Sequence, residues 1–311
     1  MKNKIFNNLV VISFLILFLE VLFNKSLVFN TISYSLNIWV NNLIPSMFPF
    51  FIISDILINY GFINLIPKFI KKIFSNLFNV GDNLISIFFL SILSGFPSSA
   101  RITRNLYDKK IIDVNDANHI LMFTHFANPL FILSTVGITF LGYEKYGIII
   151  LISHYLGNVI IGIIFRSHFY NNHTNYNSIT NKSQSFSNIL IKSIKSSIDT
   201  LLLILGTLTC FLIISSLIIN KLNLSLYPAS IIKGILEMTM GLNSLSLLNI
   251  PNIYKVVIST MFISFGGLAV HMQVISQIVD TNISYSYFFI ARILHSIISG
   301  SICYLLFIFL F

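Results

Sequence analysis

The stretch Ser94-Gly95-Phe96-Pro97-Ser98-Ser99-Ala100-Arg101 places helix-breaking residues directly after the apolar run 85–93. A second stretch, Ser264-Phe265-Gly266-Gly267-Leu268-Ala269-Val270-His271-Met272-Gln273, follows the apolar run 256–263 in the same way. A break in an apolar helix frees backbone groups that hydrocarbon cannot satisfy, so it persists only where protein or a water-filled cavity receives it. Paired broken segments in the two halves of a chain are a sequence signature of a transport site. The two stretches therefore predict a polytopic membrane protein with a solute path.

The composition is that of a membrane protein. Of the 311 residues, 55% are hydrophobic and only 9% are charged, whereas about a quarter are charged in soluble domains. The formal net charge of +9 arises mainly in loops between apolar segments. Such a basic excess reports membrane topology, so no nucleic-acid partner is expected. Cys210 and Cys303 lie in apolar stretches and predict neither a disulfide framework nor a metal site.

Apolar segments long enough to cross a bilayer predict an all-α fold with about six spanning helices. These segments are 6–23, 39–60, 126–141, 147–165, 200–219 and 287–311. The two interrupted segments, 83–104 and 256–278, are expected to be broken or re-entrant. Lys2 and Lys4 precede the first run as in a signal peptide, but no small-residue cleavage site follows it. An uncleaved first helix is therefore expected.

A polar stretch rich in Asn, Ser and Thr separates two membrane halves that have a similar order of parts. The predicted organisation is an N-terminal transmembrane helix (1–35), a first membrane repeat (36–166), a polar cytoplasmic linker (167–197) and a second membrane repeat (198–311). Because Lys and Arg favour cytoplasmic loops, the N-terminus and residues 68–72 are predicted to be cytoplasmic. Residues 231–241 are then predicted on the opposite side, and the halves are predicted to form an inverted repeat.

Polar groups at membrane depth are costly and are usually paired or functional. Asp55 and Glu237 are such groups, and each has two interpretations. Either one pairs with Arg101 or Arg292 to stabilise the bundle, or it binds a substrate or a coupling ion. The candidate substrate-binding residues are Ser94, Gly95, Ser98, Arg101, Asn128, Glu237, Thr239, Gly266, Gly267, His271 and Gln273.

Five of these candidates are expected to converge from distant segments on one polar cavity near mid-membrane. They are Arg101, Asn128, Glu237, His271 and Gln273. A buried polar group without a partner costs roughly 1–3 kcal/mol, and a shared wet cavity removes that cost.

Glycines at the breaks permit backbone conformations that side chains would block, and Pro97 removes a helical hydrogen bond. The resulting half-helices would direct N–H groups and a positive dipole end towards a ligand. Close helix crossing at small residues is the alternative interpretation. Alanine is expected to be tolerated poorly at Gly95 and Gly266, but well at Gly147, at the end of an expected helix.

No pattern in the sequence predicts catalysis. No Gly-rich loop ends in Gly-Lys-Ser/Thr, and His168 and His173 are a weak metal signal in an Asn-rich loop. His125, His154 and His295 occur singly along expected helices. An enzyme is therefore not expected, nor is a cofactor or a bound metal.

The motifs resemble those of the YlbJ family of sporulation integral membrane proteins, which carry the nucleoside recognition domain, also called the gate domain. They occur in the family's order from Trp39 to the carboxyl end. The matching stretches are Trp39-Val40-Asn41-Asn42-Leu43-Ile44-Pro45-Ser46-Met47-Phe48-Pro49-Phe50, 94–101, Ala127-Asn128-Pro129-Leu130-Phe131-Ile132, Glu237-Met238-Thr239-Met240-Gly241 and 265–273. Three positions depart from the pattern: Phe96 replaces a common Tyr, Ser98-Ser99 a common Val-Gly, and Ala269 a common Ser.

The resemblance implies a multi-pass protein of the cell membrane, or of a membrane of the developing spore, that is needed for the spore cortex or coat. The gate domain is similar to parts of nucleoside and ferrous-iron transporters. Two function classes follow. A transporter would move a small polar solute such as a nucleoside. A scaffold would hold spore-envelope membrane proteins or form a homo-oligomer, with the breaks serving only packing. Polar residues at both breaks favour the transporter.

Overall fold

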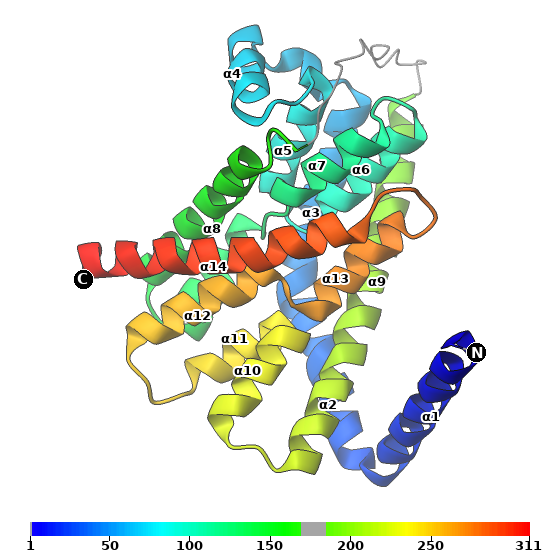
Figure 1. Ribbon diagram of the computed structural model, residues 1–311, viewed down its shortest axis with the longest axis vertical. Helices are drawn as coiled ribbons and strands as arrows, with labels where there is room; N and C mark the ends of the chain where they lie inside the picture. Colours follow the sequence, from blue (N-terminus) through cyan, green and yellow to red (C-terminus); the bar gives the residue numbers. More distant parts are fainter. Residues whose placement is uncertain (1, 169–184) are drawn as a thin grey trace.

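The computed structural model describes residues 2–168 and 185–311, which form helices and their connections without any strand (Figure 1). The first half contains α1 (Lys2–Phe23), α2 (Lys25–Ile38), the π-helical η1 (Trp39–Leu43), α3 (Ile44–Asn59), the 3₁₀-helical η2 (Phe62–Leu65), α4 (Lys68–Phe78), α5 (Asp82–Ser94), α6 (Ser98–Asp108), α7 (Val114–Phe123), the π-helical η3 (Phe131–Phe140) and α8 (Glu144–Ile164). The second half contains α9 (Phe186–Leu222), α10 (Leu226–Leu236), α11 (Met238–Ser246), α12 (Asn252–Phe265), α13 (Gly267–Ile278) and α14 (Tyr285–Leu310).

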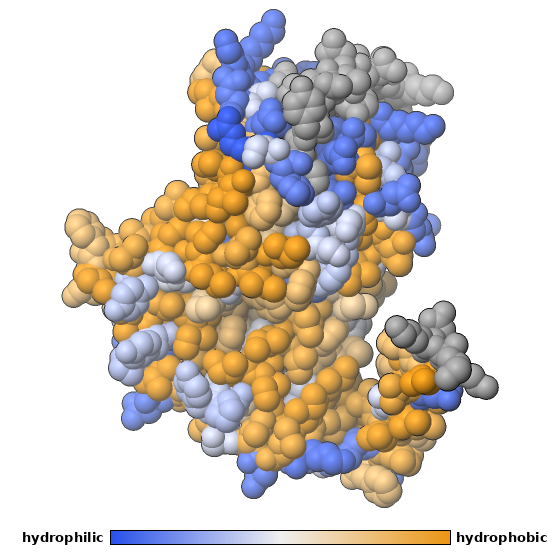
Figure 2. Space-filling model, in the orientation of Figure 1, coloured by the Kyte–Doolittle hydropathy of each residue, from blue (hydrophilic) through white to orange (hydrophobic). Residues whose placement is uncertain are grey.

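Six helical stretches in the described residues are long and apolar enough to cross a bilayer, which confirms the predicted all-α polytopic class. They are Ile5–Phe23, Lys25–Asn59, Glu144–Ile164, Phe186–Leu222, Asn252–Ile278 and Tyr285–Leu310. Hydrophobic side chains cover much of the middle of the molecule in Figure 2, and hydrophilic ones gather around α4 and α6 at the upper end and again at the lower end. This distribution suits a protein surrounded by lipid.

The set of six differs from the predicted set at three places. Residues 126–141 are not a continuous span, because the chain is non-helical at 124–128 and helical again only from Pro129, which lacks a backbone N–H. The predicted span 39–60 is the second part of a longer stretch in which η1 joins α2 to α3. The segment 256–278 counts among the six by length and composition, although Gly266 interrupts it as predicted.

The predicted linker 167–197 is partly helical. Residues 169–184, including His173, lie outside the described part of the chain. From Phe186 onwards the chain is already in α9, because apolar residues recur there at helical spacing and bury Ile189. With 37 residues, α9 is about 55 Å long at 1.5 Å per residue, far longer than a hydrocarbon core of roughly 30 Å.

Each half contains two broken helix pairs between long helices. In the first half, α5–α6 breaks at residues 95–97 and α7–η3 breaks at 124–128; in the second, α10–α11 breaks at Glu237 and α12–α13 at Gly266. In chain order the Gly95 break therefore corresponds to the Glu237 break, whereas the sequence analysis paired the Gly95 break with the Gly266 break. Figure 1 shows α5–α6 in the upper part of the molecule and α10–α11 in the lower part.

Two apolar clusters hold these pairs in place. One, with Phe51, Phe131 and Leu212, packs α3, α9 and η3 together. The other joins α4, α5, α7 and α8, with the rings of Phe78 and Phe123 stacked at a centroid distance of 4.7 Å. By contrast, α1 stands apart, its apolar side chains exposed, and its Glu20 pairs with Lys221 at the end of α9.

The predicted orientation has a direct chemical test. In a background without Cys210 and Cys303, a cysteine at exposed Lys72 on α4 is expected to react with an impermeant maleimide only after cells are permeabilised. A cysteine at Leu226, 76% exposed at the start of α10, is expected to react in intact cells. Labelling of both positions from the same face would contradict the inverted repeat.

Candidate functional site

The first and third breaks meet at a small cavity in the middle of the molecule, here called the central cavity. Phe96 comes from the α5–α6 break, Glu237 from the α10–α11 break, and Gln273 from α13. The full lining is Leu43, Met47, Phe96, Ile204, Leu208, Glu237, Met238, Thr239, Ala269, Val270 and Gln273. Its volume is about 20 Å³, roughly what one water needs. The cavity therefore has room for no more than about one water molecule.

Glu237 is held by the helix that it begins. Its backbone is extended (φ −143°, ψ 111°), and its buried carboxylate accepts hydrogen bonds from the backbone N–H groups of Thr239 (3.0 Å) and Met240 (2.7 Å). These N–H groups have no helical acceptor, and a carboxylate both satisfies them and suits the positive end of the helix dipole. A short apolar hairpin can thus carry a carboxylate at the centre of the protein.

Gln273 links two helices across the central cavity. Its Nε2 donates to the hydroxyl of Thr207 on α9 at 3.0 Å. Thr207 in turn donates to the carbonyl of Leu203, one turn earlier on α9, at 2.9 Å. Glu237, Thr239 and Gln273 are the predicted residues that the structure brings together.

The predicted glycine breaks are confirmed as backbone geometry. Gly95 has φ +74° and ψ −179°, a combination essentially restricted to glycine. A Cβ at Gly95 would lie 2.7 Å from the backbone nitrogen of Asn128, and a Cβ at Gly267 would lie 2.9 Å from that of Met238. Each hairpin break therefore packs against the second break of its own half. Gly266 has φ +93° but ordinary space around it.

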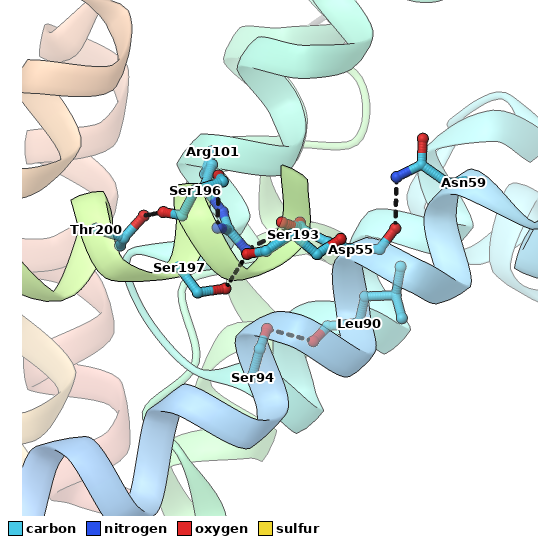
Figure 3. Close-up of polar contacts among 9 residues, drawn as sticks. All are labelled: Asp55, Asn59, Leu90, Ser94, Arg101, Ser193, Ser196, Ser197 and Thr200. Carbon is cyan, nitrogen blue, oxygen red and sulfur yellow. Dashed lines mark hydrogen bonds and ion pairs between the residues drawn. The ribbon is translucent and has the colours of Figure 1, made fainter. Parts of the chain in front are cut away.

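Several predicted residues lie elsewhere. The Asn128 side chain accepts from the N–H groups of Leu130 (2.8 Å) and Phe131 (3.3 Å), which caps η3 beside Gly95. Ser94 donates to the carbonyl of Leu90 at 2.7 Å (Figure 3). The buried hydroxyl of Ser98 has no hydrogen-bond partner within residues 2–168 and 185–311.

The expected convergence of five residues is therefore wrong for Arg101, Asn128 and His271, which do not line the central cavity. Arg101 lies one turn beyond its break and pairs with Asp55 at 3.0 Å, as one of the two sequence interpretations proposed (Figure 3). His271 faces away from the central cavity: one ring nitrogen bonds the hydroxyl of Tyr285 on α14 (2.7 Å), and the other bonds the carbonyl of Phe265 at the end of α12 (3.0 Å).

A buried polar cluster around the 124–128 break was missed by the sequence analysis. Arg292, fully buried on α14, donates to the carbonyl of Met122, to Asn158 Oδ1 (3.1 Å) and to His295 (2.8 Å). Asn158 also donates to the carbonyl of His125 at 3.0 Å. The cluster thus supplies partners for backbone groups freed at the end of α7.

His154 completes this cluster. Its Nε2 accepts from the N–H of Ala127 at 2.9 Å, so the ring proton belongs on Nδ1, 3.0 Å from the hydroxyl of Ser264. His154 therefore joins the second break of one half to that of the other. The available sequence signal was spacing: His154 and Asn158 are four residues apart, and Arg292 and His295 three, which places each pair on one helix face.

Residues 40–144 match the Gate family of nucleoside recognition domains. The matched region holds the first two breaks, the Asp55–Arg101 pair and Asn128. The chain is also 25% identical over 331 residues to the sporulation integral membrane protein YlbJ of Bacillus subtilis strain 168, covering 95% of this chain and 81% of that protein. No solved structure matches the chain significantly. The predicted resemblance is confirmed: the chain is similar to the Gate family over residues 40–144 and to YlbJ over most of its length.

The glycine geometry predicts graded effects of alanine. Gly95→Ala adds a clash with Asn128 to backbone strain of about 1–3 kcal/mol, so it is expected to lower the thermal unfolding midpoint more than Gly266→Ala, which adds strain only. Gly206→Ala on α9 is the control, because nothing lies within 4 Å of its Cβ. The expectation that Gly147 tolerates alanine stays a prediction, although a Cβ there would lie 3.1 Å from the Cα of Gly137. Equal midpoints for all variants would contradict the assigned breaks.

The polar cluster makes Arg292 a structural residue. Arg292→Met is expected to destabilise the detergent-solubilised protein, at about 1–3 kcal/mol for each acceptor left without a donor. Thermal unfolding followed by the fluorescence of Trp39 measures this effect. Arg166→Met, at an exposed position, is the matched control, and equal stability of the two variants would show that Arg292 does not hold the break.

Proposed function

We propose that this protein is a transporter-like membrane protein of spore formation whose Gate-type core binds a small polar solute at the central cavity. The observation that carries the proposal is the meeting of two broken helix pairs around Glu237, Thr239 and Gln273. Broken helices whose ends face a mid-membrane site are the usual way in which transporters bind polar solutes. The description of the Gate family as nucleoside recognition makes a nucleoside the first solute to test.

Binding requires the central cavity to open. A space of about 20 Å³ does not admit a nucleoside, so α5–α6 and α10–α11 must separate. The close backbone contacts at the breaks join Gly95 to Asn128 and Gly267 to Met238, each pair within one half. Separation of the halves at the cavity leaves both contacts intact. Rocking of one repeat against the other is the corresponding motion in known transporters.

The biological setting in the proposal comes from the relative. YlbJ is a sporulation integral membrane protein, and the extension to this chain is a role in making the spore cortex or coat. The proposed location is the cell membrane or a membrane of the developing spore, with the N-terminus in the cytoplasm. No catalytic step belongs to the proposal.

A scaffold for spore-envelope assembly is the second candidate. It is favoured by the small volume of the central cavity and by the hydrogen bonds that occupy Arg101 and His271 elsewhere. In a scaffold the breaks serve only packing, and no solute binds.

Solute binding separates the two candidates. Purified protein is expected to bind a nucleoside in calorimetry. Gln273→Ala is expected to weaken that binding roughly tenfold or more, because the lost amide contact is worth about 1–2 kcal/mol. Gln277→Ala, one turn further along α13, is the matched control. The role of the Glu237 carboxylate is tested by comparing nucleoside binding of the Glu237→Gln variant with that of Glu144→Gln, a variant at the exposed start of α8.

The same variants test the role in cells. The gene for this protein is introduced into Bacillus subtilis lacking YlbJ, and restoration of spore formation is measured. The Gln273→Ala variant is expected to fail to restore it at normal protein abundance, whereas the Gln277→Ala variant is expected to restore it. Full complementation by both variants, together with no nucleoside binding by the purified protein, would overturn the solute site and favour the scaffold.

A further inference from the structure

A second, larger pocket lies between α3, α6 and α9, here called the upper pocket. Its volume is about 280 Å³, and polar side chains line much of it. Asp55 and Asn59 come from the end of α3, Arg101 and Lys109 from α6, and Lys192 and Ser196 from the start of α9. The pocket is large enough for a small solute, unlike the central cavity.

The charges of the upper pocket favour an anion. Arg101, Lys109 and Lys192 face it together with a single carboxylate, Asp55, so its formal charge is +2. Clefts lined by one sign of charge concentrate ions of the opposite sign. Arginine and lysine, placed together, are the side chains that bind phosphate oxygens best.

Arg101 is fixed in position for such a role. Its Nη2 donates to Asp55 Oδ1 at 3.0 Å and its Nη1 to the hydroxyl of Ser196 at 3.1 Å (Figure 3). The guanidinium also lies 5.2 Å from the centre of the Phe51 ring. Its side chain is only 11% exposed, and its Nε has no hydrogen-bond partner among the residues that the structure describes. Contacts from two neighbouring helices, α3 and α9, thus hold the Arg101 charge at the pocket wall.

The upper pocket is distinct from the central cavity. Along α9, Ser196 lines the upper pocket, and Ile204 and Leu208 line the central cavity. Eight residues of helix from Ser196 to Ile204 separate them by about 12 Å. Between them, Thr200 on α9 bonds the carbonyl of Ser196 at 2.8 Å (Figure 3).

We propose that the upper pocket is a binding site for a phosphate group, carried by a small solute or by a lipid headgroup at the membrane surface. Arg101 and the two lysines contact the phosphate oxygens. Asp55 holds Arg101 in place and limits the excess positive charge, so that a bound phosphate can leave. The site does not depend on nucleoside binding at the central cavity, because a nucleoside has no phosphate.

Inorganic phosphate is the first probe. Calorimetry of the full chain in phosphate-free detergent solution is expected to show binding that weakens as salt is added. The double variant Lys109→Gln/Lys192→Gln is expected to weaken it roughly tenfold or more, since two charge-assisted contacts are lost. The control is Lys68→Gln/Lys71→Gln on α4, which removes the same charge outside the pocket.

A variant that is expected to strengthen phosphate binding distinguishes a specific effect on the site from a general loss of folding. Asp55→Asn removes the one carboxylate and is expected to tighten phosphate binding, whereas a purely structural Asp55–Arg101 pair predicts lower stability without tighter binding. Nanodiscs of phosphatidylcholine with and without phosphatidic acid separate the two sources: competition by phosphatidic acid assigns the site to a headgroup, and its absence assigns it to a soluble phosphate. No phosphate binding, or equal binding by both lysine double variants, would overturn the proposal.

Discussion

The structure depends on one constraint: every backbone group freed at a helix break must find a partner inside the protein. Two of the breaks, at Glu237 and at 124–128, solve this with side chains. A carboxylate, Glu237, accepts from the first N–H groups of α11, and an amide, Asn128, does the same for η3. At the other end of the 124–128 break, Arg292 and Asn158 donate to carbonyls that α7 leaves open. Because water is absent from the hydrocarbon region, these bonds are a condition for having breaks at all.

The same constraint explains which features the sequence revealed. The breaks at Gly95 and Gly266 were predictable because glycine and proline interrupt a helix through their own covalent structure. The break at Glu237 was less visible, because a capping carboxylate leaves no such mark in an apolar run, and the break at 124–128 is marked only by Pro129 at its end. The missed break at 124–128 also explains why residues 126–141 were assigned as a span, and why Gly95 was matched with Gly266.

Long-range contacts account for the remaining differences. The Asp55–Arg101 pair was foreseen as one of two alternatives, since two opposite charges at membrane depth favour each other. Two partners of Arg292, Met122 and Asn158, lie more than 100 residues away in sequence, and nothing in local periodicity selects them. His271 was placed at the solute path because it follows a break, but its helix turns it towards Tyr285. The position of His271 in the sequence identified its helix, but the packing of neighbouring helices determines the direction in which its side chain points.

The length of α9 has a mechanical consequence. This single helix of 37 residues reaches from the upper pocket, past the central cavity, to the ion pair with α1. A stiff rod about 55 Å long acts as a lever, since a tilt of about 5° around its middle displaces each end by about 2 Å. A tilt of α9 would therefore move one wall of the upper pocket and one wall of the central cavity together, because residues of this single helix line both.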